Sequence, residues 1–568
     1  MRIRHVRVER FRGIQVLDWA MGGDYICLIG PGDSTKSTVL DAIDLALVPR
    51  RNIVFNDSDF YKSDTSNAIE IRVTLGDLPN DWVRDSKYGL HLRGWSPSSE
   101  LHDEPQQGDE SVVTVGLRVD DSLDPEWTVV VDRDLPSIPL RWKDRENIGC
   151  FKLGAFPDWH LSWTRGSVLS RLTGEPGNIG QVLAEASRAA RGAVDAQPFE
   201  GLHEGVEKAE KAALRFGVAP EEKYEPHLDV KAVSIGAGGM SLHDGAVPVR
   251  MAGLGTKRLL ALGLQMELVK RGGIVLVDEV EHGLEPHRVR HLLRLFREDL
   301  EGGAGTGQVL LTTHSNVAVG ELKAEELRVV RSANGTTTIQ AVPTDIQNVA
   351  IKASEALLSR RVLVCEGATE LGLCRGLDSW WGTQDHSSFG LQGIGLVDGG
   401  GSSTASVATK ISSLGYCVAY LGDSDVKLDP TPEQMRAAGV SVFLWDDDLC
   451  LEQRAAEDLP WEGVVDVVHL AMEYFPEASI RDQVAGRLGK KTESLPKDVG
   501  DWQALGEAEV RKAVAESAKS SGKKKRGWFK RVDIAEELAA VLGRYWKAIE
   551  AKDLGRKLAA LRAWIDAP

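Results

Sequence analysis

The feature that most constrains the fold is a glycine-containing loop between an apolar strand and a helix. Residues 25–29 form a short apolar run, and the loop Gly-Pro-Gly-Asp-Ser-Thr-Lys-Ser-Thr follows it at residues 30–38. Residues 39–47 then place apolar side chains at helical spacing. A strand, a loop of this composition and a helix in this order are typical of a phosphate-binding P-loop within an α/β sheet.

In such a loop the backbone N–H groups and the helix N-terminus hold the phosphates. Lys36 is expected to reach the terminal phosphates of ATP, and the Ser37 hydroxyl to ligate Mg²⁺. The other loop residues expected at the nucleotide are Gly30, Gly32, Ser34, Thr35 and Thr38. Thr35 departs from the motif, in which glycine precedes the lysine, so its side chain either crowds the loop or requires an unfavourable backbone angle. Whether it abolishes hydrolysis is left open, and the motif alone also fits an ordinary glycine-rich turn.

Three further elements follow in the order of an ATPase core. Residues 274–279 are an apolar strand ending in Asp278, predicted to hold Mg²⁺, and Glu279, predicted to polarise the attacking water. Residues 309–315 are a second apolar strand, which places His314 as a γ-phosphate sensor. Before both strands, a glycine-rich signature at residues 250–258 opens an apolar helix. Its phosphate donors are Gly253, Gly255 and Thr256. Taken singly, Asp278 and Glu279 also fit acidic surface residues, and His314 also fits a structural histidine. The prediction therefore depends on the order of all four elements.

Two pairs of carboxylates later in the chain each follow an apolar strand. Glu366 and Glu370 come after residues 362–365, and Asp423 and Asp425 after residues 417–421. A helix starting after residue 367 would hold Glu370 close to Glu366. Hard oxygen ligands suit Mg²⁺ or Mn²⁺, and two such ions about 4 Å apart activate water and stabilise the leaving oxygen of a phosphodiester. Either pair alone also fits acidic surface turns after core strands.

These motifs resemble known families. The order of P-loop, signature, acidic strand and His strand resembles the ATP-binding-cassette (ABC) ATPases of the SMC/RecF/Rad50 type, whose N-terminal strand is similar to residues 9–13. The carboxylate pairs, with the Asp-Gly-Gly-Gly turn at residues 398–401 between them, resemble a Toprim domain. An ABC-type ATPase followed by Toprim and a helical tail resembles the OLD (overcoming lysogenization defect) family, which includes the nuclease subunit of the Gabija phage-defence system.

The resemblance implies an ATP-regulated, metal-dependent DNA endonuclease in bacterial antiviral defence. ABC-type heads sandwich ATP between two copies, which implies a homodimer or higher homo-oligomer, and a helicase is a candidate partner protein. The implied catalytic residues are Glu366, Glu370, Asp423, Asp425, Glu279 and His314. Relatives carry a further Glu and a late Lys, for which Glu452 and one of Lys523, Lys524, Lys525 and Lys530 are the candidates.

The distribution of charge allows a confined nucleic-acid surface. The chain of 568 residues has a net charge of −16, but residues 511–568 hold 15 Lys/Arg and 7 Asp/Glu, a local balance of +8. Residues 522–530 mix cations with aromatic side chains, as a backbone-binding loop does. The residues expected at nucleic acid are Lys523, Lys524, Lys525, Arg526 and Lys530. A solvated helical face and a flexible loop are the alternatives.

A chain of this length exceeds one hydrophobic core, so we expect an α/β protein with several domains. Residues 1–179 and 226–355 are predicted to form the ABC-type ATPase domain, interrupted at 180–225 by a helical insertion that is a candidate dimerisation arm. Residues 356–475 are predicted to be the Toprim nuclease core, and 476–568 its helical, basic C-terminal part. The first residues are expected to form a charged, alternating strand rather than a signal peptide, and no apolar run approaches the roughly 18 residues of a membrane span. The six scattered cysteines are expected to be reduced, buried thiols, with the cytoplasm as the compartment.

Other functions stay open at this point. A nucleotide-dependent sensor or scaffold could use the Toprim region to bind a partner without cutting, although clustered carboxylates that repel phosphate argue against it. RNA is an alternative substrate, because metal-assisted hydrolysis needs nothing specific to deoxyribose. A tyrosine-based nicking and resealing enzyme ranks low, since the chain has eight Tyr and no recognisable topoisomerase domain. Nicking versus double-strand cutting, sequence specificity, the direction of ATP control and oligomer size are not determined.

Overall fold

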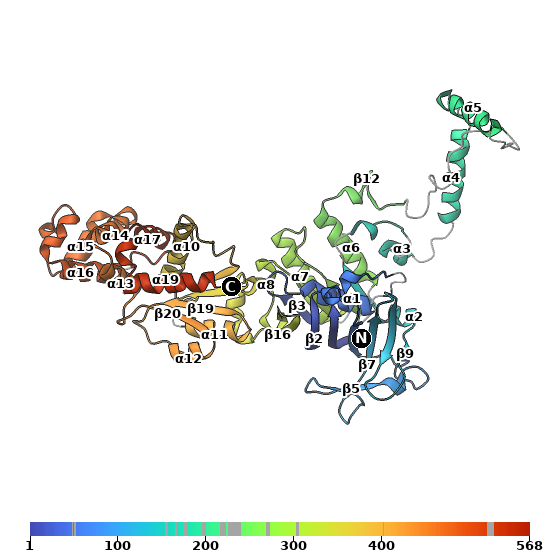
Figure 1. The fold of residues 1–568 in the computed structure, drawn as a ribbon, viewed down its shortest axis with the longest axis horizontal. Coiled ribbons are helices and arrows are strands. Elements are labelled where there is room, and N and C mark those ends of the chain that lie inside the picture. The colour runs from blue at the N-terminus through green and yellow to red at the C-terminus, as the bar shows by residue number, and fades with distance from the viewer. Residues whose placement is uncertain are drawn as a thin grey trace.

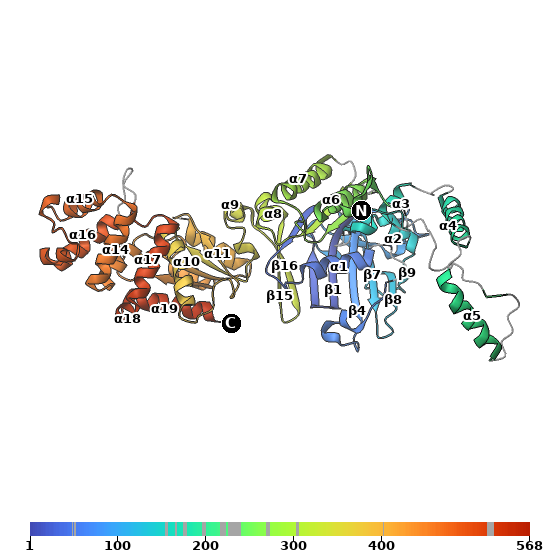
Figure 2. The same cartoon turned by 90° about the horizontal axis from the view of Figure 1, so that it is seen from above.

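The computed structural model describes most of the chain, in two lobes that lie along the long axis (Figures 1 and 2). The described residues are 1–47, 49, 53–153, 157–164, 167–173, 179–195, 200–215, 223–224, 240–268, 273–302, 306–401, 403–519 and 527–567. The N-terminal lobe runs from β1 to α9, and the C-terminal lobe from β17 to α19. The α/β fold class predicted from the sequence is confirmed.

The N-terminal lobe is built on one sheet of fourteen strands among the described residues. Its parallel part has the order β10-β13-β14-β3-β15. These strands are β10 (Cys150–Leu153), β13 (Gly273–Val277), β14 (Thr306–Thr312), β3 (Tyr25–Ile29) and β15 (Leu327–Ala333). The P-loop strand therefore lies beside the strand that leads to His314, and the carboxyl ends of these strands meet at one edge.

The rest of this sheet is an antiparallel layer, apart from the parallel pairing of β16 with β2. Its strands are β16 (Thr336–Ala341), β2 (Ile14–Ala20), β1 (Arg2–Phe11), β4 (Ile69–Gly76), β7 (Glu110–Val119), β5 (Arg93–Trp95), β6 (Leu101–His102), β8 (Pro125–Val130) and β9 (Ile138–Pro139). A separate small hairpin pairs β11 (His243–Asp244) with β12 (Val247–Pro248).

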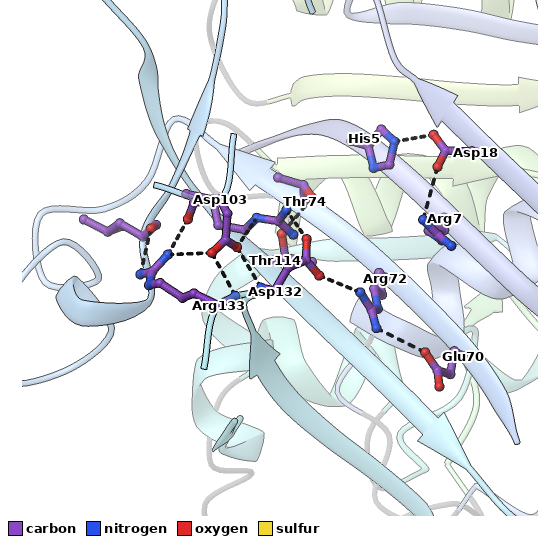
Figure 3. Close-up of polar contacts among 12 residues, drawn as sticks. His5, Arg7, Asp18, Glu70, Arg72, Thr74, Asp103, Thr114, Asp132 and Arg133 are labelled. Atoms are coloured by element: carbon purple, nitrogen blue, oxygen red, sulfur yellow. Dashed lines mark hydrogen bonds and ion pairs between the residues drawn. The ribbon is translucent and has the colours of Figure 1, made fainter. Parts of the chain in front are cut away.

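The two faces of the antiparallel layer differ in chemistry, because side chains alternate along each strand. Apolar side chains of one face pack against α1 (Lys36–Leu47) in a single core. The other face carries pairs of polar and charged side chains. For example, Asp18 Oδ1 lies 2.7 Å from His5 Nε2, and Asp18 Oδ2 lies 3.7 Å from Arg7 Nη1 (Figure 3). Arg72 donates to Asp132 at 3.0 Å and to Glu70 at 3.2 Å. This face therefore holds its charged side chains in pairs with one another.

Helices cover the parallel strands and extend from them. They are α2 (Trp142–Ile148), α3 (Val168–Thr173), α6 (Leu254–Leu268), α7 (Pro286–Gly302), α8 (Asn316–Glu321) and α9 (Gln347–Lys352). Two more, α4 (Ile179–Asp195) and α5 (Glu200–Arg215), occupy the predicted helical insertion and project from the lobe (Figures 1 and 2). In the described part of the chain, no helix has both the length and the apolar character needed to cross a bilayer.

The C-terminal lobe contains a four-stranded parallel sheet with the order β18-β17-β19-β20. The strands are β17 (Arg361–Cys365), β18 (Ile394–Asp398), β19 (Cys417–Gly422) and β20 (Val440–Leu444), which confirms the strands predicted before Glu366 and Asp423. The crossover helices are α10 (Ala368–Gly382), α11 (Thr404–Ser413) and α12 (Pro432–Ala437). The proposed domain boundaries themselves stay predictions.

A helical region completes this lobe and includes the helical C-terminal part predicted at residues 476–568. Its helices are α13 (Leu451–Asp458), α14 (Trp461–Tyr474), α15 (Glu477–Arg487), α16 (Glu507–Lys519), α17 (Val532–Arg544), α18 (Trp546–Ile549) and α19 (Asp553–Asp566). The closest packing joins α10 to α17, where a Cβ added at Gly372 or Gly376 would lie 2.6 Å from the Cβ of Ala535 or Ala539. Small residues at a spacing of four thus let these two backbones touch.

The two lobes share a hydrophobic core rather than meeting only through a linker. One cluster of buried side chains includes Cys27 and Ile29 of the P-loop strand together with Val362 and Val418 of the second sheet. At its edge the guanidinium of Arg331, on β15, lies 3.7 Å from the ring centroid of Tyr416. The nucleotide loop and the second sheet therefore belong to one packed body. All six cysteines are free thiols; five are buried as expected, and Cys417 is exposed.

Candidate functional site

The P-loop connects β3 to α1, as its sequence predicts. Gly30 has a φ of +136°, and a Cβ there would lie 2.6 Å from the carbonyl oxygen of Val330, so only glycine fits. The buried Lys36 folds back over the loop, where its Nζ donates to the carbonyls of Gly30 (3.1 Å) and Pro31 (2.8 Å) and to Ser34 Oγ (3.1 Å). The lysine thus satisfies its N–H groups with the loop itself.

The acidic strand meets the P-loop at the carboxyl edge of the sheet. Ser37 Oγ donates to Asp278 Oδ1 at 2.8 Å, and Thr312 Oγ1 donates to the same oxygen at 2.6 Å. The structure thus brings together the two side chains expected to hold the Mg²⁺ of ATP. Glu279 follows with a φ of +46° and a half-exposed side chain, 3.4 Å from Nδ1 of His282. Its carboxylate is free to reach water next to the nucleotide loop.

Thr35 shows how the loop accommodates the missing glycine. Its φ is +68°, the unfavourable angle expected from the sequence. Its Oγ1 donates to the Ser34 carbonyl at 2.6 Å and lies 3.1 Å from Oγ1 of Thr337 on β16. A Cβ at Gly13 would lie 3.2 Å from the Thr35 methyl group, so the side chain also packs against the β1–β2 turn. The loop keeps its shape, with strain stored at Thr35.

The signature is attached to the acidic strand rather than to the P-loop of its own chain. Arg258 is buried in the first turns of α6, and its Nη1 and Nη2 donate to the carbonyls of His282 (2.9 Å) and Asp278. Burial lowers the pKa of this guanidinium. Among the described residues, no hydrogen bond or ion pair joins the signature donors to the loop at 30–38. The donors in question are Gly253 and Thr256, both exposed, and the buried Gly255.

His314 follows β14, as its sequence predicts, with an exposed side chain. Its backbone N–H donates to Glu281 Oε1 at 2.7 Å, while Thr313 Oγ1 donates to Oε2 of the same glutamate at 2.6 Å. Glu281 therefore holds the strand end that presents His314. β14 and β3 are neighbouring strands, which places His314 near the P-loop. In the part of the chain that the structure describes, however, no hydrogen bond joins the imidazole to that loop.

The second group of candidate residues lies at the carboxyl edge of the smaller sheet. β17 and β19 are adjacent and parallel, and Glu366 and Asp423 directly follow them. The N–H of Asp423 donates to Glu366 Oε2 at 2.8 Å. Glu370, in the first turn of α10, accepts from the Gly367 N–H at 3.0 Å. The first acid pair, Glu366 and Glu370, therefore lies close to the second pair, which begins at Asp423, as expected.

Glu452 joins this group from α13 and is buried. One ligand atom from each of Asp423, Cys450 and Glu452 lies within 4.8 Å of the others. Asp423 Oδ1 accepts from Trp445 Nε1 at 3.2 Å and from the Leu451 N–H at 2.9 Å, which fixes its orientation. We call Glu366, Glu370, Asp423, Asp425 and Glu452 the acid cluster.

Lysines reach the acid cluster from two places. Lys530 Nζ lies 3.1 Å from Glu452 Oε1, so Lys530 is the member of the candidate lysines that the structure places here. Lys519 Nζ lies 2.6 Å from Asp425 Oδ2. The other predicted nucleic-acid residues, Lys523, Lys524, Lys525 and Arg526, lie outside the described residues.

The electrostatics of the acid cluster fit a divalent cation. Burial, followed by repulsion from neighbouring acids, raises the pKa of Glu370 to about 7 and that of Asp423 to about 8. Burial also raises the pKa of Glu366. Glu452 Oε2 and Glu370 Oε1 are buried without a hydrogen-bond partner, and Glu452 Oε1 faces the Lys530 ammonium. Buried, mutually repelling carboxylate oxygens of this kind are the donor set that Mg²⁺ or Mn²⁺ prefers.

Sequence comparison places the nucleotide-binding part in a known family. Residues 26–320, more than half of the chain, match the family described as "AAA domain, putative AbiEii toxin, Type IV TA system". The chain belongs to this AAA-domain family. The AAA domain so defined contains the P-loop, the signature, the acidic strand and His314, so nucleotide binding belongs to the chain's function.

The AAA-domain chain is also similar to a curated relative and to solved structures. It is 24% identical over 350 residues to the "OLD nuclease" of Thermus scotoductus, a match that covers 58% of the chain and 62% of that relative, so it spans less than two thirds of the relative's length. The resemblance to the OLD family is confirmed by this relative. The SMC head domain from Thermotoga maritima shares 13% identity, with coverage of 60% of this chain and 100% of that one and a TM-score of 0.29. The Smc head domain with an extended coiled coil bound to the C-terminal domain of ScpA, from Pyrococcus furiosus, shares 10% identity, with coverage of 60% and 96% and a TM-score of 0.33.

Several residues at both sites escaped the sequence analysis. Beside the AAA-domain site, Lys152 on β10 pairs with Asp41 and lies 3.8 Å from Asp278 Oδ2. At the acid cluster, Tyr420 lies 3.4 Å from Glu366 Oε2, in addition to Cys450 and Lys519 described above. Tyr420 and Cys450 lie close in sequence to predicted acids, a signal that could have found them. Lys152 and Lys519 have no such signal, since their partners come from distant parts of the chain.

Proposed function

We propose that this AAA-domain protein is an ATP-regulated, divalent-metal-dependent DNA endonuclease of the OLD type. The observation that carries the proposal is the acid cluster, in which Glu366 and Asp423 are joined at the ends of adjacent strands and Glu370 Oε1 and Glu452 Oε2 are buried without a hydrogen-bond partner. Such a group of carboxylates is costly unless cations occupy it. Its presence on the same chain as an AAA domain supports a nuclease under nucleotide control.

The chain's own residues have distinct roles in this proposal. Glu366, Glu370, Asp423 and Asp425, with Glu452, would hold Mg²⁺ or Mn²⁺. Two such ions would activate the attacking water and stabilise the leaving oxygen. The Asp423 N–H orients Glu366, and Trp445 with the Leu451 N–H orients Asp423. Lys530, together with the cations at 523–526, would meet the phosphate backbone of the substrate.

The nucleotide site would be completed by a second copy. Lys36 and Ser37 would hold the phosphates and Mg²⁺ with Asp278, Glu279 would polarise water, and His314 would sense the γ-phosphate. Gly253, Gly255 and Thr256 would approach the ATP of the partner, which is supported by their attachment to the acidic strand of their own chain. Exposed apolar side chains that fit an interface are Met251 and Leu254 beside the signature and Val182, Leu202 and Leu214 on α4 and α5.

The remaining parts of the proposal rest on family resemblance. They are the Toprim nature of residues 356–475, the role in bacterial antiviral defence, the helicase-type partner and the cytoplasmic location. The four-stranded parallel sheet with acids after β17 and β19 supports the Toprim assignment.

The test is cleavage of supercoiled plasmid by the purified chain with Mg²⁺ or Mn²⁺, with and without ATP. Metal-dependent cutting is expected to be lost in Asp423→Ala while ATP binding is unchanged. Glu493→Ala, an exposed acid of the same lobe, is the matched control and should cut as the wild type does. Cutting that survives Asp423→Ala would refute the metal site. Cutting of RNA alone would change the substrate, and nucleotide binding without cutting of either would favour a sensor.

A further inference from the structure

Two lysines from different helical segments pair with two different acids of the acid cluster. Lys530, which precedes α17, lies beside Glu452, and Lys519, the last residue of α16, lies beside Asp425. The family resemblance implies one late lysine, for which Lys530 is a candidate beside Glu452. Lys519 is a second cation, whose partner, Asp425, is a proposed metal ligand.

The position of Lys519 is set by packing between α13 and α16. Its Nζ lies 2.6 Å from Asp425 Oδ2 and 3.3 Å from Oε1 of Gln453 on α13. The Gln453 amide in turn donates to Glu516 Oε1, one turn before Lys519, at 3.1 Å. Only 30% of the Lys519 side chain and 17% of the Asp425 side chain are exposed, so water screens this pair weakly.

An ammonium at this position conflicts with a metal ion on the same oxygen. Mg²⁺ binds carboxylate oxygen at roughly 2.0–2.1 Å, and an ammonium nitrogen 2.6 Å from that oxygen would face it as a like charge at close range. The other acids differ in part, because Glu370 Oε1 and Glu452 Oε2 are buried without a hydrogen-bond partner, while Glu452 Oε1 faces the ammonium of Lys530 at 3.1 Å. Glu370 Oε1 and Glu452 Oε2 are therefore open to a cation, whereas Oδ2 of Asp425 is paired with Lys519.

We propose that Lys519 competes with the divalent cation for Asp425, and must be displaced before Asp425 becomes a metal ligand. This inference rests on the proposed nuclease function and adds an order of loading to it. The first cation enters among Glu366, Glu370, Asp423 and Glu452, and a second, more weakly bound cation takes Asp425 from Lys519. Lys519 is thus a positioning residue that sets the metal concentration at which the site is complete.

The experiment is calorimetric titration of the full chain with Mn²⁺ at low ionic strength. The wild type is expected to show two classes of site. Lys519→Met should tighten the weaker class by about tenfold or more and leave the stronger class unchanged, because it removes the competing charge. Lys519→Gln, which retains hydrogen-bonding capacity without charge, should do the same. Lys512→Met, an exposed lysine of the same helix, is the control and should match the wild type.

The outcomes separate this inference from the proposed function. Two classes of site in the wild type with no tightening in either Lys519 variant, or with weaker binding, would overturn the inference and leave the metal site standing. Asp425→Asn should remove the weaker class, and its persistence would overturn the assignment of that class to Asp425. No Mn²⁺ binding in any variant would overturn both the metal site and the competition. Thermal unfolding of each variant identifies losses of affinity caused by misfolding.

Discussion

The N–H of Asp423 donates a hydrogen bond of 2.8 Å to Oε2 of Glu366, two acids that are 57 residues apart in the sequence. The bond follows from the parallel register of β17 and β19, in which Cys365 lies opposite Leu421. Because the donor is the backbone of residue 423, changes to its side chain leave Glu366 in place. Substitutions in the acid cluster can therefore test its charge without dismantling its geometry.

Glu370→Gln is expected to stabilise the metal-free protein at alkaline pH. Burial first, and repulsion from Glu452 second, raise the pKa of Glu370 to about 7, from 4.5 in an unperturbed chain. The folded state thus holds this proton more tightly than the unfolded state does. The stability that protonated Glu370 contributes is therefore fully present below about pH 4.5 and is lost as the pH rises through about 7. A neutral glutamine avoids this loss, and we expect a gain of about 1–3 kcal/mol at pH 8 in EDTA, measured by urea unfolding.

The same variant should respond less to metal. Mn²⁺ is expected to raise the melting temperature of the wild type more than that of Glu370→Gln, since a ligand has been lost. Glu493→Gln serves as the exposed control. An equal or lower stability of Glu370→Gln at pH 8 in EDTA would contradict the electrostatic account of the cluster.

Thr35→Gly is expected to relieve strain in the P-loop. The φ of +68° costs a threonine about 1 kcal/mol and a glycine almost nothing. We expect a higher melting temperature and several-fold faster ATP hydrolysis, because the loop can then adjust around the phosphates. Thr337→Val removes the hydroxyl partner of Thr35 and keeps the backbone, so it is the control. Unchanged hydrolysis in Thr35→Gly would show that this side chain does not limit the enzyme.

The sequence predicted the elements whose signals are local. The strands before Lys36, Glu279, His314, Glu366 and Asp423 were found from apolar runs, and acids that end neighbouring strands were expected to meet. Packing between elements is different, because the residues that it brings together follow no pattern of spacing along the chain. Lys519 meets Asp425 through the contact of α13 with α16, and Lys152 meets Asp41 through the contact of β10 with α1. Neither pair has a pattern along the chain, so the sequence could not show it.

ATP binding is expected to take up a proton at alkaline pH. Burial lowers the pKa of Lys36 to about 8, and the phosphates of ATP would raise it again. Below pH 7 the lysine is charged before and after binding, so affinity is insensitive to pH. Above about 8 binding must protonate it, and affinity should fall by up to about tenfold per pH unit. Calorimetry at pH 9 in buffers of different ionisation enthalpy measures the uptake.

Lys36→Arg is the matched variant for this measurement, since its guanidinium stays charged at pH 9. The proton uptake should disappear in this variant. If the wild type binds ATP at pH 9 without taking up a proton, the buried lysine is not the group that meets the phosphates.

Gly376→Ala is expected to destabilise the C-terminal lobe by about 1–3 kcal/mol, the range for overpacking. A Cβ at Gly376 would lie 2.6 Å from the Cβ of Ala539, and α10 and α17 would have to separate. Glu370 lies at the start of α10 and Lys530 precedes α17, so metal affinity should fall as well. Gly382→Ala, at the end of α10 in open space, is the control for urea unfolding. Equal stability of the two variants would contradict close packing of these helices.

Glu279→Gln is expected to trap an ATP-bound dimer. The carboxylate is half-exposed beside the turn that follows the acidic strand, and replacing a general base of this kind lowers hydrolysis by about 10²-fold or more while ATP still binds. Light scattering after gel filtration should then give twice the chain mass of 61.9 kDa with ATP. Adding Gly253→Asp at the exposed signature should abolish the ATP-dependent dimer, because a second negative charge would face the γ-phosphate. If Glu279→Gln has the same mass with and without ATP, the heads do not close on the nucleotide in the way proposed.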